Sequence, residues 1–338
     1  MKKRLINLVL ISLLISLFFC MSVYAGEWKS DKNGWKYQND DGSYTVNGWQ
    51  WIPNPQDKGT AQCFYFDENG YNLYDTTTPD GYTLDHSGAW AVDGVIQNKL
   101  LEQNVTLTQE LDPSTGLIKG TMVGDITGEF KYYLYIPKNA TDNMPMVVWL
   151  HGAGIMKNKQ KITDDDCIKY LMNAGKESIP AYVLIPYIDH EDTKLRGSIS
   201  AIATLINKIA SEYCVDQKRI SGIGISNSAS GLVVLAYTYP EIFSCIVPIS
   251  ASPKEGINLE DKYMKTLSKM PVWYFIEEIG WSQVQHANLL NSAQKLRDAG
   301  GTVWTTVLKG RDHHSINIFQ NGTNDEFGIF DWIVTVSK

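Results

Sequence analysis

A serine among glycines and other small residues is the first candidate for chemistry in this 338-residue sequence. The stretch 219–231 reads RISGIGISNSASG: an apolar strand pattern, then Ser226, then small residues leading into the apolar run that starts at Leu232. This order is typical of a nucleophile elbow, where a serine occupies the tip of a sharp turn between a strand and a helix. The usual spacing is Gly-x-Ser-x-Gly, and Ser228 stands in place of the second glycine.

Ser226 is the predicted nucleophile in spite of that replacement. Ser228, the alternative, would lack a glycine two residues before it, because Ser226 itself occupies that position. Glycine is favoured after the nucleophile because strand and helix backbones pack closely at an elbow. Serine is among the smallest replacements, and the neighbours Ala229 and Ser230 keep the turn slim. We therefore expect a strained elbow that still functions.

A serine hydroxyl becomes a good nucleophile only when a base takes its proton, and His313 is the predicted base. It lies in GRDHHS, residues 310–315, directly after the last predicted strand, and Gly-x-x-His spacing favours it over the adjacent His314. Four other histidines complete the six in the sequence. His86 falls in the aromatic N-terminal region and His151 beside a glycine turn. His190 falls in a loop before the nucleophile, and His286 falls on a predicted helix.

A glycine-rich turn after another apolar strand could stabilise the negative charge that develops on a carbonyl oxygen. Residues 150–154, LHGAG, follow the apolar run that starts at Met146. Small residues let backbone N–H groups approach a substrate closely. Gly152 or Ala153 is predicted to supply one donor, and Asn227, just after the serine, the other. The alternative is an ordinary turn at the end of a strand.

The elements that must position these groups alternate between strands and helices. This alternation predicts an α/β fold class with a mostly parallel central sheet, and continuous apolar runs fit strands that are buried on both faces. An alternating strand is expected within 124–137. Further strands are expected at 146–150, 182–185, 219–225, 244–249, 272–276 and 303–308, and helices at 164–173, 199–213, 289–299 and 329–336. The aspartates at 164–166 fit a helix start better than a calcium site.

Residues 26–94 follow a different pattern. Aromatic pairs two residues apart alternate with Asn-Gly and Asp-Gly steps, and long aliphatic runs are missing. These features predict short strands joined by tight hairpins. Such hairpins cannot bury their faces alone, so we expect a small all-β module of stacked repeats of roughly 20 residues.

The N-terminal pattern GW…Y…DG…Y…GWxW, over about 70 residues, resembles the cell-wall-binding repeats of Gram-positive surface proteins, of the choline-binding and glucan-binding type. The resemblance implies aromatic clusters that bind choline or a glucan-like cell-wall polymer and anchor the protein there. The alternative is that the tryptophans form only the small core of the hairpins: Trp35, Trp49, Trp51 and Trp90.

From about residue 104 onward the chain resembles the α/β-hydrolase superfamily. Within it, the chain is similar to secreted esterases related to polyhydroxybutyrate depolymerases, feruloyl esterases and prolyl-oligopeptidase-type peptidases. The matching stretches, in order, are MPMVVWLHGAG, VDQKRISGIGIS, MPVWYFIEE and GRDHHS. The resemblance implies that Ser226 and His313 act on an ester or amide through an acyl-enzyme, without a cofactor or metal.

The resemblance also implies a carboxylate that orients the histidine. Relatives carry an aspartate after the seventh strand, and Gly280 occupies that position here. A glutamate can orient the histidine in the same way with its longer side chain, so Glu278 is the predicted acid. Glu277 is the alternative and Glu255 a more remote third. A serine–histidine dyad without an acid is a further alternative.

The first 25 residues predict a secretory signal peptide: three cations, then an apolar run, then small residues ending at Ala25. Removing it would take away three cations and move the net charge from −7 to about −10. An acidic surface argues against nucleic acid and anionic membranes as partners, and we expect no membrane span in the mature chain. The mature cysteines are expected to be small buried residues.

Together these features predict three segments: a signal peptide at 1–25, aromatic hairpin repeats at 26–103 and an α/β-hydrolase domain at 104–338. The predicted function is cleavage of carboxylic esters by an exported protein at the cell wall of a Gram-positive bacterium. An acylated glycan is the leading hypothesis for the substrate. The alternatives are a serine peptidase of the same fold and a glycan-binding surface protein whose hydrolase domain is inactive.

Overall fold

The computed structural model describes residues 26–152, 161–174, 179–188, 198–251, 261–279, 283–313, 315–316, 318–320 and 324–338. The expected signal peptide lies outside them. The chain divides into two compact units, Met1–Trp51 with Phe64–Ala89, and Ile52–Cys63 with Trp90–Lys338. Residues 90–103, which the sequence pattern assigned to the repeat module, therefore group with the larger unit.

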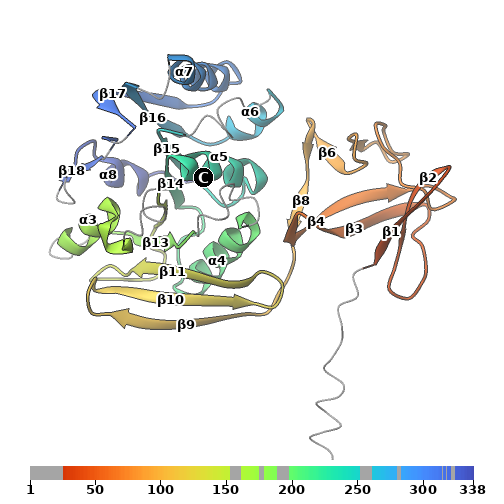
Figure 1. The fold of residues 1–338 in the computed structure, drawn as a ribbon, viewed down its shortest axis with the longest axis horizontal. Coiled ribbons are helices and arrows are strands. Elements are labelled where there is room, and N and C mark those ends of the chain that lie inside the picture. Colours follow the sequence, from red (N-terminus) through yellow and green to blue (C-terminus); the bar gives the residue numbers. More distant parts are fainter. Residues whose placement is uncertain are drawn as a thin grey trace, which may run out of the picture. The chain divides into compact units, whose positions relative to one another are not determined.

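A nine-stranded sheet forms the centre of the larger unit, in the order β17-β16-β15-β14-β12-β13-β11-β10-β9 (Figure 1). Strands β12 to β17 pair in parallel, as predicted, and β9, β10 and β11 form an antiparallel edge. The bounds are β9 Val105–Asp112, β10 Leu117–Gly124, β11 Gly128–Tyr135, β12 Met146–Leu150, β13 Tyr182–Pro186, β14 Ile220–Ile225, β15 Cys245–Ile249, β16 Val272–Ile279 and β17 Val303–Asp312. The sequence pattern did not predict β9 and β10, whose side chains are mostly exposed or half-buried.

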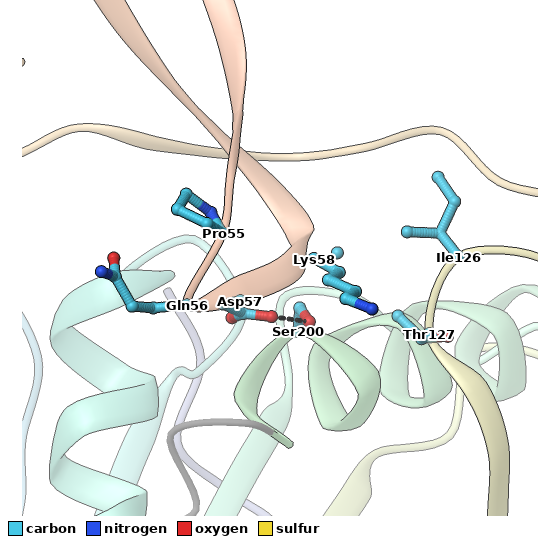
Figure 2. A pocket seen from close by; sticks show the side chains of 8 residues that line it. Pro55, Gln56, Asp57, Lys58, Ile126, Thr127 and Ser200 are labelled. Atoms are coloured by element: carbon cyan, nitrogen blue, oxygen red, sulfur yellow. Dashed lines mark hydrogen bonds between the residues drawn. The ribbon is translucent and has the colours of Figure 1, made fainter. Parts of the chain in front are cut away.

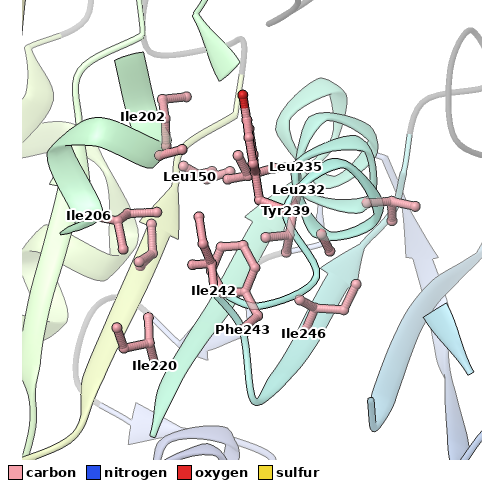
Figure 3. Packing of buried hydrophobic residues seen from close by; sticks show 14 of the residues in the cluster. Leu150, Ile202, Ile206, Ile220, Leu232, Leu235, Tyr239, Ile242, Phe243 and Ile246 are labelled. Atoms are coloured by element: carbon pink, nitrogen blue, oxygen red, sulfur yellow. The ribbon is translucent and has the colours of Figure 1, made fainter. Parts of the chain in front are cut away.

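The sheet is buried on both faces because side chains alternate along each strand. In β12, Met146, Val148 and Leu150 belong to one hydrophobic cluster, whereas Val147 and Trp149 belong to a second. Figure 3 shows Leu150 in the first cluster among side chains of β14 and of the helices α4 (Ile199–Glu212) and α5 (Asn227–Thr238). This arrangement explains why β12 is apolar without interruption.

Helices pack on both faces of this sheet. Their bounds are α3 Asp166–Ala174, α4 Ile199–Glu212, α5 Asn227–Thr238, α6 Asp261–Leu267, α7 Gln283–Asp298 and α8 Ile329–Ile333. Residues of α4, α5, α6 and α7 belong to the first hydrophobic cluster, and residues of α3 and α8 to the second. In the part of the chain that the structure describes, no helix has the length and apolar character needed to cross a membrane.

The aspartates before α3 act at the helix start, as their position suggested. The carboxylate of Asp165 accepts the backbone N–H groups of Cys167 and Ile168, at 2.9 and 3.3 Å, which is the role of an N-cap. Burial raises the pKa of Asp165 to about 6, because these hydrogen bonds only partly offset desolvation. Cys167 is buried, as are two more of the mature cysteines, but Cys214 is exposed, so the expectation of burial was wrong for that residue.

Hairpin turns of one form recur in the smaller unit. In each, the carbonyl of the first residue accepts the N–H of a glycine three residues later, in Asn39–Gly42, Asp67–Gly70, Thr78–Gly81 and Asp85–Gly88. These glycines have φ values of +81°, +78°, +90° and +82°, in the left-handed region that glycine adopts without a steric penalty. The Asn-Gly and Asp-Gly steps of the sequence therefore fall at turns.

The aromatic side chains of the smaller unit divide into two groups. The first group is a packed core, in which Trp28 meets Tyr37 and Phe64 edge-on at ring-centroid distances of 5.3 and 5.1 Å. The second is exposed, and it includes Trp35 and Trp51, which are 54% and 38% accessible. The strands here are β1 Glu27–Asp31, β2 Gly34–Gln38 and β5 Thr83–Leu84, while β3 Gly48–Asn54 and β4 Asp57–Phe66 continue into the larger unit.

The turn between β3 and β4 lies against the start of α4 within the larger unit (Figure 2). Asp57 accepts a hydrogen bond from Ser200, the second residue of α4, and a carboxylate is favourable near a helix N-terminus. Beside this contact is a cavity of about 250 Å³, lined by Pro55, Gln56, Asp57, Lys58, Gly59, Ile126, Thr127 and Ser200. The larger unit also contains short strands: β6 Trp90–Val92, β7 Val95–Ile96, β8 Asn98–Leu100, β18 Phe319–Gln320 and β19 Asn324–Asp325.

Candidate active site

Ser226 lies at a sharp turn between β14 and α5, where the sequence pattern placed it. Its backbone has φ +58° and ψ −123°, a conformation that is rarely populated by residues other than glycine and that persists only when the surroundings enforce it. The Ser226 N–H donates to the carbonyl of Ile249, at the end of the neighbouring strand β15, at 2.9 Å. The turn is therefore strained and held from outside, as expected of an elbow.

Gly224 makes the tight turn possible. A Cβ atom at this position would lie 2.6 Å from the carbonyl oxygen of Ser228 and 3.0 Å from the Cα of Ala229. The close approach of strand and helix therefore occurs at Gly224, before the nucleophile. This explains how the elbow accommodates a serine at 228, where glycine is usual.

His313 lies next to the serine. Its Nε2 is 2.8 Å from the Ser226 Oγ, and its side chain is 13% exposed. The residue directly follows β17, on the same sheet edge as the elbow, because β14 to β17 are parallel and their carboxyl ends lie together. His314, the alternative, lies outside the described residues.

The carboxylate beside His313 belongs to Glu277 and not to Glu278, which corrects the prediction of Glu278. Glu277 Oε1 is 3.2 Å from His313 Nδ1. The side chain of Glu278 instead accepts the N–H of Gly310 at 2.7 Å. Neighbouring side chains of a strand point to opposite sides, so only one of the two adjacent glutamates can face the histidine. Glu255 and Gly280 lie outside the described residues.

Glu277 is almost fully buried, with 2% of its side chain exposed. Desolvation opposes its ionisation, but the hydrogen bond with His313, together with smaller contributions from the nearby Ser250 hydroxyl and from its own backbone, outweighs that effect and holds the pKa of Glu277 below its usual value. His286 in α7 also faces the Glu277 backbone carbonyl, with its Nδ1 at 2.9 Å. An ionised carboxylate facing Nδ1 places the imidazole proton there and leaves Nε2 to accept the serine proton.

Ser228 is engaged elsewhere. Its hydroxyl donates to the backbone carbonyl of His151 at 2.6 Å, in a buried position. His151 is also fully buried, and its Nε2 accepts the N–H of Ile188 at 3.1 Å. Neither residue is therefore arranged as nucleophile or base. The sequence pattern pointed to both as candidates for chemistry or turn residues but gave no sign that they contact each other.

The predicted oxyanion donors lie on two segments beside the serine. Gly152 follows β12, and a Cβ atom there would be 3.0 Å from Ile225 Cγ2, so this turn runs close to the elbow. Asn227 is the first residue of α5, and N–H groups at a helix start favour negative charge. Ala153 lies outside the described residues.

Comparison with solved structures bears on the fold. A solved structure described as a thermostable esterase aligns with 82% of this chain and 73% of its own, with a TM-score of 0.52 and 19% identity. The larger unit has the α/β-hydrolase fold. Within this fold, a strand–serine–helix elbow and a histidine after the last strand occupy the positions used for acyl transfer.

Two curated relatives match a smaller part of the sequence. The sequence is 24% identical over 172 residues to acetylxylan esterase A of Emericella nidulans, covering 47% of this chain and 56% of that protein. It is 27% identical over 138 residues to acetylxylan esterase A of Aspergillus ficuum, covering 37% and 43%. The chain thus spans about half the length of the curated relatives it matches. No protein-family model matches the sequence.

Proposed function

We propose that this protein is a serine hydrolase of carboxylic esters, with Ser226 as nucleophile, His313 as general base and Glu277 as the acid that orients His313. The observation that carries the proposal is the hydrogen-bonded chain from Ser226 Oγ to His313 Nε2 at 2.8 Å and from His313 Nδ1 to Glu277 at 3.2 Å. Distances of this size are those at which a base takes a serine proton and is itself held in place.

The reaction follows from this arrangement. Ser226 Oγ attacks the ester carbonyl carbon while its proton moves to His313 Nε2. The carbonyl oxygen becomes an oxyanion, which the N–H group of Gly152 or Ala153 and that of Asn227 stabilise. His313 then gives its proton to the departing alcohol, leaving an acyl-enzyme. Water attacks the carbonyl carbon of this acyl-enzyme ester while His313 takes its proton. His313 then returns that proton to Ser226 Oγ as the bond between Oγ and the acyl carbon breaks and the acid product leaves.

An acetylated polysaccharide is the substrate class that we propose. Two curated relatives are named acetylxylan esterases, and the smaller unit exposes aromatic side chains of the kind that stack on sugar rings, such as Trp35 and Tyr74, at 54% and 60% accessibility. We also propose that the protein is exported and that the smaller unit binds a cell-wall glycan. The cationic start and apolar run of residues 1–25, together with the Gram-positive repeat pattern, support this part of the proposal.

Covalent labelling by a fluorophosphonate tests the chemistry. We expect stoichiometric labelling of the unmodified protein, with peptide mapping placing the phosphonyl group on Ser226. Ser226→Ala should lose the label, whereas Ser228→Ala should keep it, because the Ser228 hydroxyl is bound to a backbone carbonyl and not to His313. Absence of label from the unmodified protein, or a label on Ser228, would refute the proposed nucleophile.

Acetate release from acetylated xylan tests the substrate class. The same assay should be run on xylan from which the acetyl groups have been removed and on an N-acetylated peptide. Acetate release from acetylated xylan, and from neither of the other two, would support an acetylated glycan as the substrate. A labelled Ser226 with activity on the peptide alone would replace the esterase proposal with a peptidase.

Gly224 offers a test of the elbow geometry. Gly224→Ala is expected to lower kcat on a soluble acetyl ester about 100-fold, because its Cβ would meet the backbone of α5 and a shift of about 1 Å at the nucleophile has effects of this size. Gly222→Ala is the matched control, since its Cβ would meet the side chains of Leu232 and Phe243 and not the backbone of α5. Equal kcat values for the two variants would contradict this account.

A further inference from the structure

The hydroxyl at position 228 makes a contact that a Gly-x-Ser-x-Gly elbow cannot make, because glycine has no side chain. Ser228 Oγ donates to the His151 carbonyl at 2.6 Å, and the two residues are 3% and 0% exposed. A buried hydroxyl–carbonyl bond is a fixed link, since no water competes for either group. This link joins the nucleophile helix α5 to the turn after β12.

The geometry of the peptide bond gives this link a consequence at Gly152. The carbonyl of His151 and the N–H of Gly152 belong to one planar peptide group, in which they point in opposite directions. A donor that fixes the carbonyl therefore also fixes the direction of the Gly152 N–H. This N–H is one of the two proposed donors on the turn that receives the oxyanion.

His151 is also held from a second side. The ring of His151 accepts the N–H of Ile188, just after β13, at 3.1 Å. The ring contact anchors the side chain, whereas the Ser228 contact anchors the carbonyl. Ser228 is also only one residue beyond Asn227, whose N–H is the other proposed oxyanion donor. One hydroxyl thus connects the backbones that carry both donors.

We propose that Ser228 is a positioning residue that holds the oxyanion-binding turn in register with Ser226. The inference rests on the proposed ester hydrolysis. It assigns a role to the residue that departs from the usual elbow: the close approach of strand and helix depends on Gly224, which leaves position 228 available for a side chain that binds the turn. Ser228 does not contact the reacting atoms in this role.

The test compares Ser228→Ala with Ser244→Ala. Ser244 is a matched control because it is also a buried serine whose hydroxyl donates to a backbone carbonyl, that of Ile220, at 3.1 Å. Ile220 begins β14 and Ser226 follows its end, so the control bond lies at the far end of the strand. Both variants should lose thermal stability by a similar shift in midpoint.

Only Ser228→Ala should slow the reaction. Removal of a direct oxyanion donor lowers kcat by about 10² to 10³, and loss of a residue that positions such a donor should have a smaller effect, about tenfold. KM should stay within about twofold, because the lost interaction concerns the transition state. The pH profile of kcat should keep its shape, since the Ser226–His313–Glu277 chain is untouched. Ser228→Gly, which restores the usual motif, should lose as much kcat as Ser228→Ala.

Several outcomes would overturn the inference. A kcat for Ser228→Ala within about twofold of the unmodified protein would do so, as would an equal loss in Ser244→Ala or a gain in Ser228→Gly. In each of these cases an active, Ser226-labelled unmodified protein leaves the proposed function standing. If the unmodified protein hydrolyses no ester and takes up no label, the proposed function fails and the role of Ser228 fails with it.

Discussion

Replacing His313 by alanine is expected to lower kcat on an acetyl ester by about 10⁶, the size of the effect when a serine hydrolase loses its base. The reason lies in the contact of 2.8 Å between His313 Nε2 and Ser226 Oγ. Without the imidazole, nothing in this position takes the serine proton or returns it to the leaving alcohol. KM should change little, because the interaction is made in the transition state. Steady-state kinetics with a soluble acetyl ester measures both constants.

The control for this prediction is His86→Ala. His86 is an exposed histidine of the smaller unit, 2.7 Å from Asp75, and its loss should leave kcat unchanged. Added imidazole should restore part of the activity of His313→Ala, because a small base can enter the space that the side chain leaves. If His313→Ala retained more than about a tenth of the activity, another group would have to be the base.

Glu277→Gln is expected to lower kcat by about 10⁴, whereas Glu278→Gln should stay within about twofold of the unmodified protein. A glutamine at 277 keeps the shape of the side chain but can donate a hydrogen bond to the histidine, which favours the wrong tautomer. Glu278 instead accepts the N–H of Gly310, so its replacement does not change the contact between His313 and Glu277. The reverse ranking of the two variants would restore Glu278 as the acid, and equal, small effects would indicate a dyad.

Glu277→Gln is also expected to change how the stability of the folded protein depends on pH. Because the pKa of Glu277 is held below its usual value of 4.5, the ionised carboxylate stabilises the folded protein at pH values above 4.5. That contribution is lost as the pH falls through the lowered pKa of the folded state. Unfolding curves should therefore show Glu277→Gln to be less stable than the unmodified protein near pH 7, with the difference shrinking in acid.

Several features of the fold follow directly from residue patterns. The parallel strands of the sheet are continuous apolar runs, and their short length with turn residues at the ends favours a buried strand over a buried helix. β12 was predicted with its exact residues, Met146–Leu150. By contrast, β9 and β10 went unpredicted. β9 has no buried residue and so carries little apolar periodicity, and the two strands are stabilised by pairing with each other and, for β10, with β11.

The sequence alone determined the candidate pair Ser226 and His313, because a local sequence pattern marks each of them. Ser226 is marked by the small residues after a strand, and His313 by its place in a loop after the last strand. It could not determine the acid or the role of Ser228. Glu277 and Glu278 are adjacent and chemically identical, so only the orientation of β16 beside β17 decides which one faces His313. Ser228 and His151 are 77 residues apart, and a hydrogen bond over that separation exists only once β12 and β14 lie side by side in the sheet.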